Sequence, residues 1–206
     1  MIYIHVEEPS MEETLKIVIP RILGSQNVEF RIIDHGSKQK LLQDLPSRLA
    51  GYARRIPRED IRALVVIDRD DDDCKELKAH LEKIAAHATL PTKSSPAADG
   101  QFRIVNRIVI EELEAWFFGD VPAICAAYSS VPNTLATKHG FRHSDAITGG
   151  TWEKLLLVLQ KAGYYTGNQY LPKCEVARKI AAYMDPKRNS SPSFRHFATG
   201  LMELLI

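Results

Sequence analysis

Acidic side chains follow two apolar stretches of the sequence at the positions where each stretch ends. Glu7 follows Ile2–Val6, and Asp68 and Asp70 follow Ala63–Ile67. Carboxylates two residues apart on extended backbone point to the same side, and they repel each other unless a cation or a proton lies between them. Mg²⁺ and similar hard cations prefer such oxygen ligands. We therefore expect Glu7, Asp68 and Asp70 to bind a divalent metal ion, Mg²⁺ or Mn²⁺.

A further acidic group, Glu112 and Glu114, follows the apolar stretch Phe102–Ile110. The carboxyl ends of parallel strands lie at one edge of a sheet, where open α/β sheets bind ligands. Carboxylates from three segments would therefore converge, and Glu112 or Glu114 would complete a second metal site. Two such ions would suit phosphoryl transfer, because they clamp the attacking and leaving oxygens.

Some of these acidic residues have a structural explanation. Asp71, Asp72 and Asp73 suit the first turn of a helix over 74–87, because carboxylates stabilise helix N-termini. The same explanation is open for Glu112 and Glu114, which precede an apolar helical segment. It explains Asp68 poorly, because Asp68 still belongs to the end of a strand.

The elements that must position these carboxylates alternate regularly along the first half of the chain. Strands are predicted at 2–6, 28–33, 63–67 and 102–110, separated by helices over 10–23, 38–52 and 74–87. Ser10 and Glu13 form a capping box for the first helix. This order predicts an α/β fold with a mostly parallel four-stranded sheet flanked by helices.

The composition of the chain changes after Asp120. Residues 121–128, 151–162, 174–184 and 193–205 have helical patterns joined by Gly, Pro and Asn turns. We expect an α/β domain over residues 1–120 and a helical C-terminal subdomain over 121–206 that packs on it.

The composition as a whole is that of an ordinary globular protein. The chain has 206 residues, a net charge of +1 and 45% hydrophobic residues. Its three cysteines are far apart, which predicts neither a zinc ribbon nor a disulfide framework. The sequence shows no signal peptide and no membrane span, so we expect a cytoplasmic location.

A family resemblance rests on the two acidic motifs. Glu7 after a strand, followed by a helix and later by Asp68-Arg69-Asp70 after another strand, resembles the Toprim domain of topoisomerases, primases and OLD-type nucleases. The resemblance implies a Toprim-like, Rossmann-like fold in which Glu7 is the acid/base group and the aspartates hold Mg²⁺. OLD-type nucleases use a lysine late in their sequence to stabilise the negative charge of the transition state. The resemblance implies this role for Lys173.

The wider pattern is similar to one Toprim-like family of unknown function, domain of unknown function 4276, over nearly the whole chain. The similar segments are Val6-Glu7 before Pro9-Ser10, Asp68-Arg69-Asp70 with Asp73-Cys74, Glu112–Trp116 with Asp120, and Asn189–Phe194. Genes of this family often neighbour ATPases of the OLD or ABC type, which implies an ATPase partner and a role in genome defence. Glu8 departs from the pattern, because it stands where the family has Gly.

Other residues suit a nucleic-acid substrate. Basic residues cluster before the third strand, flank the fourth strand and recur in the helical part, as a phosphate-tracking groove requires, although each is also explained as a solvated surface charge. Their positions are Arg48, Arg54, Arg55, Arg58, Arg62, Arg103, Arg107, Lys173, Arg178, Lys179, Lys187, Arg188 and Arg195. The polar segment 92–100 is expected to cover the substrate as a flap, and Trp116, Phe117 and Phe118 are expected in the core.

These expectations lead to one preferred function and two alternatives. The preferred function is a Mg²⁺-dependent nuclease that hydrolyses phosphodiester bonds in DNA or RNA. The first alternative is a non-catalytic module that binds metal or nucleic acid and regulates a partner ATPase, which Glu8 favours. The second is phosphoryl transfer on a small molecule, as in receiver or haloacid-dehalogenase-like folds. It is disfavoured because Asp68-Arg69-Asp70 lies late in the chain.

Overall fold

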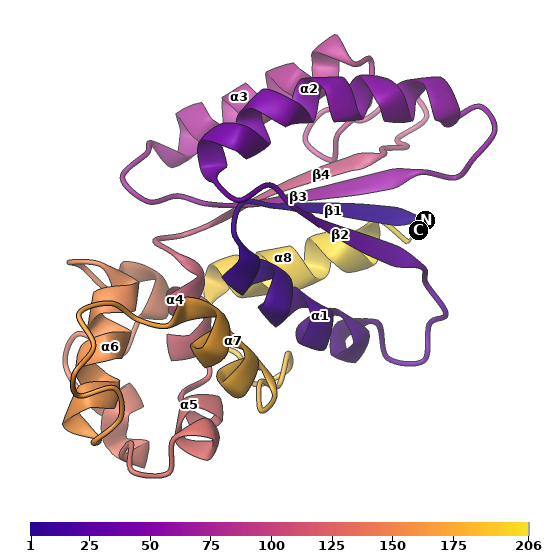
Figure 1. The fold of residues 1–206 in the computed structure, drawn as a ribbon. Helices are drawn as coiled ribbons and strands as arrows, with labels where there is room; N and C mark the ends of the chain where they lie inside the picture. The colour runs from indigo at the N-terminus through magenta and orange to yellow at the C-terminus, as the bar shows by residue number, and fades with distance from the viewer. Residues whose placement is uncertain (206) are drawn as a thin grey trace.

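Four parallel strands form the centre of the computed structural model, which describes residues 1–205. The strand order is β2-β1-β3-β4, and every neighbouring pair is parallel (Figure 1). The strands are β1 (Ile2–Val6), β2 (Phe30–Asp34), β3 (Arg62–Asp68) and β4 (Ile104–Val109). This is the predicted Rossmann-like α/β fold, in which the crossover connections are helical.

Helices cover both faces of the sheet. In Figure 1, α2 (Lys38–Arg55) and α3 (Cys74–His87) lie above the sheet, and α1 (Pro9–Leu23) and α8 (Pro192–Glu203) lie below it. Side chains of β3 alternate between the two cores, with Val65 beside α2 and α3 and Val66 on the opposite side. Both faces are therefore buried, which explains why β3 is a continuous apolar run.

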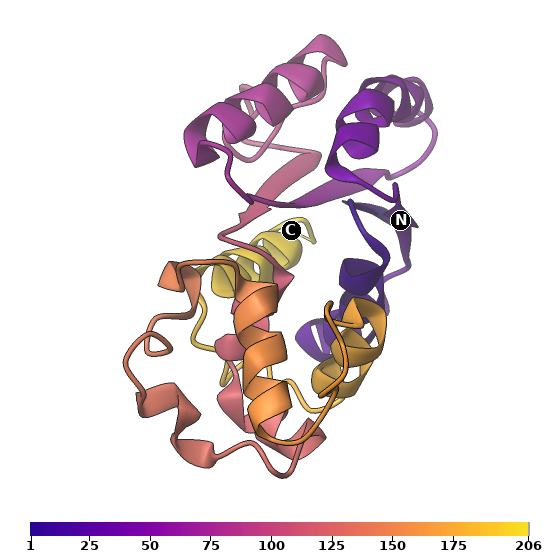
Figure 2. The same cartoon turned by 60° about the vertical axis from the view of Figure 1, so that its left-hand side comes forward.

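The remaining helices lie on the α1 side of the sheet (Figures 1 and 2). They are α4 (Leu113–Phe118), α5 (Val121–Ala127), α6 (Thr151–Lys161) and α7 (Lys173–Ala181), with two short 3-10 helices at Asn133–Thr137 and Ser144–Ala146. One hydrophobic core runs from β1 and α1 through α4 to α8. Arg21 joins α1 to α7, because its guanidinium donates hydrogen bonds of 2.7 Å to the carbonyls of Ala181, Ala182 and Met184.

The observed helix starts correct one detail of the predicted elements. Helix α1 begins at Pro9 with Glu8 as N-cap, so Ser10 lies inside the helix and the predicted capping box is wrong. Proline suits the first helical position because its fixed φ is helical and its missing N–H is not needed there. Helix α3 spans the predicted residues, and Asp73 caps it by accepting hydrogen bonds from the N–H groups of Lys75 and Glu76.

Substitution of Gly119 by alanine tests how closely α4 packs against the segment before α8. A methyl group at Gly119 would overlap Asn189 Oδ1 and lie 2.8 Å from the backbone nitrogen of Ser191. We expect Gly119→Ala to lower the free energy of unfolding by about 1–3 kcal/mol, as overpacking does. Urea denaturation measures this change.

Gly51 provides the matched control for this substitution. It lies within α2, and an added methyl group there would meet no atom within 4 Å. Gly51→Ala should therefore raise stability by about 0.5–1 kcal/mol through its helix propensity. Equal effects of the two substitutions would contradict the packing of Gly119.

Candidate functional site

The carboxyl ends of β1 and β3 meet at the point where the strand order of the sheet reverses. The chain passes from β1 to β2 on one side and then returns to β3 on the other side of β1. Open α/β sheets bind ligands outside the strand ends at such a switch point. Glu7 immediately follows β1, and Asp68 is the last residue of β3. The fold therefore brings the two predicted residues to the place where a ligand site is expected.

Glu7, Asp68 and Asp70 form one carboxylate cluster. One oxygen of each lies within 4.8 Å of those of the other two, while Glu7 and Asp68 are buried and Asp70 is exposed. Asp70 does not continue the strand, because its φ is +49° and its N–H donates to the carbonyl of Glu111 at 3.1 Å. The expected extended geometry is wrong at Asp70, but the left-handed turn still directs its carboxylate toward the other two.

Two oxygens of the carboxylate cluster have no hydrogen-bond partner among the described residues. They are Glu7 Oε2 and Asp68 Oδ1, both buried. The other oxygen of Asp68 accepts a long hydrogen bond of 3.4 Å from the N–H of Leu113. A buried carboxylate oxygen without a donor is costly. A divalent cation would satisfy both free oxygens, so the donor set fits a hard metal ion.

Burial and mutual repulsion change the protonation of the carboxylate cluster. Burial, together with the negative charge of Asp70, raises the pKa of Glu7 to about 7. Burial and then the charge of Glu7 raise the pKa of Asp68 well above its usual range. Without a cation, the cluster therefore retains a proton near neutral pH.

Lys38 is a site residue that the sequence analysis missed. It is the first residue of α2, and its ammonium lies 2.6 Å from Asp70 Oδ2 and 2.8 Å from Asp72 Oδ2. It also donates to the carbonyl of Arg69 at 3.1 Å. A sequence feature could have identified it, because a helix that follows a parallel strand begins at the same sheet edge where that strand ends.

Glu114 is buried close to the carboxylate cluster but does not belong to it. It is only 1% exposed, its Oε2 has no partner among the described residues, and burial raises its pKa to about 8. Lys173 lies nearby, and its pKa is raised by the negative charges of Glu114 and Glu8, which outweigh its burial. Its ammonium is 3.4 Å from Glu8 Oε2. Lys173 and Glu8, from distant parts of the sequence, thus form an ion pair.

Glu112 is not one of the three carboxylates of the cluster. Its Oε2 accepts hydrogen bonds from the N–H and hydroxyl groups of Thr151, at 2.9 and 2.8 Å, and from the N–H of Trp152 at 3.1 Å. A carboxylate at this position satisfies the free N–H groups at the start of α6. Glu112 therefore joins the end of β4 to α6.

Comparison with known families identifies the chain at family level. Residues 6–202 match the family described as Domain of unknown function (DUF4276). The chain belongs to this family. Searches of curated proteins and of solved structures find no match.

The family match over residues 6–202 includes all three carboxylates of the cluster in this DUF4276 chain.

Within residues 1–205, no helix has both the length and the apolar composition needed to cross a bilayer.

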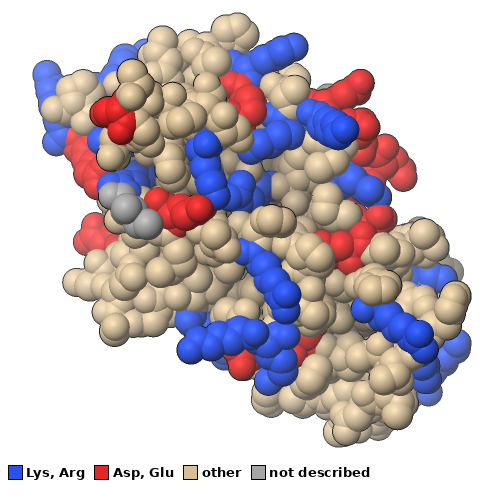
Figure 3. Space-filling view, turned by 180° about the vertical axis from the view of Figure 1, so that it is seen from behind, with Lys and Arg blue, Asp and Glu red and all other residues tan. Residues whose placement is uncertain are grey.

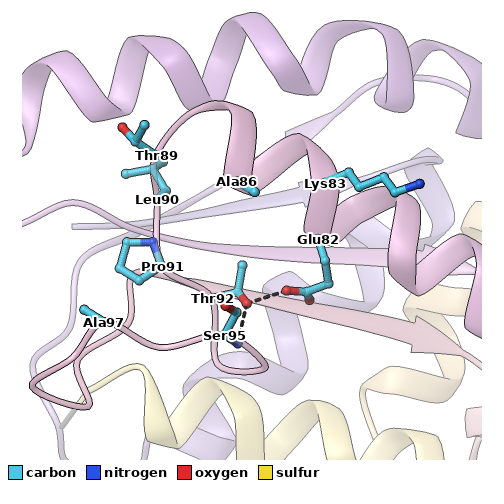
Figure 4. Close-up of a pocket in the computed structure, with 9 residues that line it drawn as sticks. All are labelled: Glu82, Lys83, Ala86, Thr89, Leu90, Pro91, Thr92, Ser95 and Ala97. Atoms are coloured by element: carbon cyan, nitrogen blue, oxygen red, sulfur yellow. Dashed lines mark hydrogen bonds between the residues drawn. The ribbon is translucent and has the colours of Figure 1, made fainter.

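The polar segment 92–100 does not cover the carboxylate cluster, and its predicted role as a flap is wrong. The N–H of Lys93 donates to the carbonyl of Ile104, the first residue of β4, whereas the carboxylates lie at the opposite ends of the strands. The segment instead lines a pocket of about 520 Å³ beside α3, where Thr92 donates to Glu82 (Figure 4).

The basic residues form no continuous stripe on the face seen in Figure 3, where they are mixed with acidic and uncharged residues. Several have acidic partners, among them Arg55 with Glu59 and Arg188 with Asp120. Near the carboxylate cluster, Lys38 pairs with Asp70, and Lys173 pairs with Glu8, the residue after Glu7. The face seen in Figure 3 therefore offers no continuous basic track for a phosphate backbone.

The raised pKa of Glu114 predicts a pH dependence of stability. A carboxyl group with a folded-state pKa above its unfolded value stabilises the protein fully below the unfolded pKa, and this contribution is lost as the pH rises through the folded pKa. For Glu114 the loss extends from about pH 4.5 to about pH 8. Glu114→Gln should remove this fall, a difference on the order of 3–5 kcal/mol in unfolding free energy by pH 8.

Chemical denaturation in EDTA between pH 5 and pH 8.5 measures the effect of Glu114→Gln. Glu175→Gln is the control, because Glu175 is exposed and its hydrogen bond to Lys179 lowers its pKa. Parallel profiles for the parent and Glu114→Gln would show that Glu114 does not carry the pH dependence.

Proposed function

We propose that this chain is a Mg²⁺- or Mn²⁺-dependent phosphodiester hydrolase that acts on DNA or RNA. One observation supports it above all: Glu7, Asp68 and Asp70 converge at the switch point of the sheet, and two of their buried oxygens lack any donor among the described residues. A divalent cation could replace the retained proton and use these oxygens, and an ion held there would polarise a phosphoryl oxygen and activate water.

The residues of the chain have distinct roles in this proposal. Asp68 and Asp70 hold the metal ion, and Glu7 either shares it or exchanges a proton, since its pKa of about 7 suits acid/base work at neutral pH. Lys173 and Lys38 stabilise the negative charge that develops on the phosphoryl oxygens in the transition state. These roles agree with the Toprim-like pattern of Glu7 and Asp68-Arg69-Asp70, which we include in the proposal. Glu112, which caps α6, has a positioning role.

A second candidate is a non-catalytic module that binds metal or nucleic acid and regulates an ATPase of the OLD or ABC type. It is favoured by the ion pairs Lys38–Asp70 and Lys173–Glu8, which already neutralise part of the site. In an active enzyme these cations would have to turn toward the substrate. Either candidate would be consistent with a role beside an ATPase in genome defence.

Cleavage of nucleic acid by the purified protein tests the first candidate. With Mg²⁺ or Mn²⁺, we expect Asp68→Ala and Asp70→Ala each to lower the rate by about 100-fold or more, because each removes a metal ligand. Asp72→Ala is the matched control, since Asp72 also contacts Lys38 but lies outside the carboxylate cluster. Unchanged cleavage in the Asp68 and Asp70 variants would eliminate the proposed site.

Metal binding can be measured without turnover. A ligand that binds only the folded state raises its stability, so Mn²⁺ should raise the melting temperature of the parent but not that of Asp68→Asn. The rise should be larger at pH 8 than at pH 6, because the proton on Glu7 must leave before that oxygen binds a cation. Mn²⁺ binding without cleavage, together with an altered rate of a partner ATPase, would favour the regulatory module.

A further inference from the structure

An aromatic pair with one exposed ring lies on segments that are connected to the candidate site. The rings of Trp152 and Tyr170 are stacked, with their centroids 6.1 Å apart and their planes at 28°. Trp152 is half-buried against the main hydrophobic core, whereas Tyr170 is 72% exposed. Trp152 therefore lies beside the tyrosine ring, most of which is open to solvent.

Two short connections join this pair to the carboxylate site. The N–H of Trp152 donates to Glu112 at 3.1 Å, and Glu112 precedes Leu113, whose own N–H donates to Asp68. Tyr170 precedes Lys173 by three residues, which span at most about 11 Å of extended chain. Both aromatic rings are thus attached to residues that contact or surround the site. Helix α6 begins at Thr151, next to Trp152, and α7 begins at Lys173. Both helices lie on the same side of the sheet in Figure 1.

The surroundings of Tyr170 favour a base over a protein partner. The four preceding residues, Thr166 to Gln169, are exposed, and three of them carry polar side chains while the fourth is Gly167. The core of a protein interface needs a continuous apolar patch, which these residues do not offer. A single ring among polar groups suits stacking of a nucleobase, and Lys173 could contact the adjacent phosphate once it turns away from Glu8.

We propose that Trp152 and Tyr170 form a stacking platform for single-stranded nucleic acid, which makes single strands the substrate class of the carboxylate site. This inference rests on the proposed function, because the site would cleave the strand that the platform holds. Bases paired within a duplex are stacked on one another and do not offer a free face to Tyr170. Single strands, with free base faces, bind through aromatic platforms of this kind.

Tryptophan fluorescence can detect binding to the platform. The chain has two tryptophans, and Trp116 is fully buried with its indole N–H donating to Ser193, so quenching by a ligand reports Trp152. We would titrate the protein in EDTA with an oligothymidylate of about 15 nucleotides, a length near the upper end of the site sizes of single OB folds. Quenching is expected for the single strand and weaker binding for a duplex of the same length.

The variants separate stacking from general surface effects. Tyr170→Ala should weaken binding of the oligothymidylate by about 5- to 150-fold, whereas Tyr170→Phe should bind like the parent because it retains the ring. Tyr183→Ala is the matched control, since Tyr183 is also exposed, at 53%, but lies beyond the other end of α7. Absence of quenching, equal binding by Tyr170→Ala and the parent, or an equal loss in Tyr183→Ala would overturn the platform.

The outcomes distinguish this inference from the proposed function. Cleavage that depends on Asp68, combined with binding that does not depend on Tyr170, would overturn the platform and leave the nuclease. Binding that depends on Tyr170, combined with no cleavage or with cleavage that survives Asp68→Ala, would support the platform and overturn the nuclease.

Discussion

Repulsion between carboxylates at the junction of β1 and β3 is the constraint on which the rest of the site depends. A parallel sheet with both faces covered buries the ends of its central strands, so Glu7 and Asp68 lose solvent while they face each other. Charge of one sign is tolerated there only with protons, ammonium groups or metal ions. Protons stay on Glu7 and Asp68 because the pKa values of both carboxyl groups are raised. Lys38 and Lys173 supply the ammonium groups. The remaining free oxygens are what a metal ion would use.

The helical part stabilises this arrangement from below the sheet. Asp120 accepts hydrogen bonds from the N–H of Asp185 and from Arg188, and Asn189 donates to the carbonyl of Trp116 at 2.8 Å. Ser191 caps α8 by accepting from the N–H of Phe194 at 3.1 Å. Hydrogen bonding between the segments Glu112–Trp116 and Asn189–Phe194 thus joins α4 to the start of α8. They fix the backbone that carries Glu114 beside the site.

The sequence was most informative where periodicity and chain order determine structure. Strand ends predicted Glu7 and Asp68 correctly as neighbours, because parallel topology brings the ends of β1 and β3 to one edge. The same rule excludes the flap, since segment 92–100 precedes β4 and so lies at the opposite edge. The Glu112–α6 contact and the Trp152–Tyr170 stack depend on how helices pack on one another, and no local pattern encodes that packing.

The backbone of Asp70 has a consequence for how this chain can change. Its φ of +49° lies in the left-handed region, which costs a non-glycine residue about 1 kcal/mol. Glycine would relieve this strain but would remove one of the three carboxylates. Stability and chemistry therefore favour different residues at this position. Selection for heat resistance alone would drive position 70 away from aspartate, and retention of aspartate in a thermostable descendant would be a record of selection for the site itself.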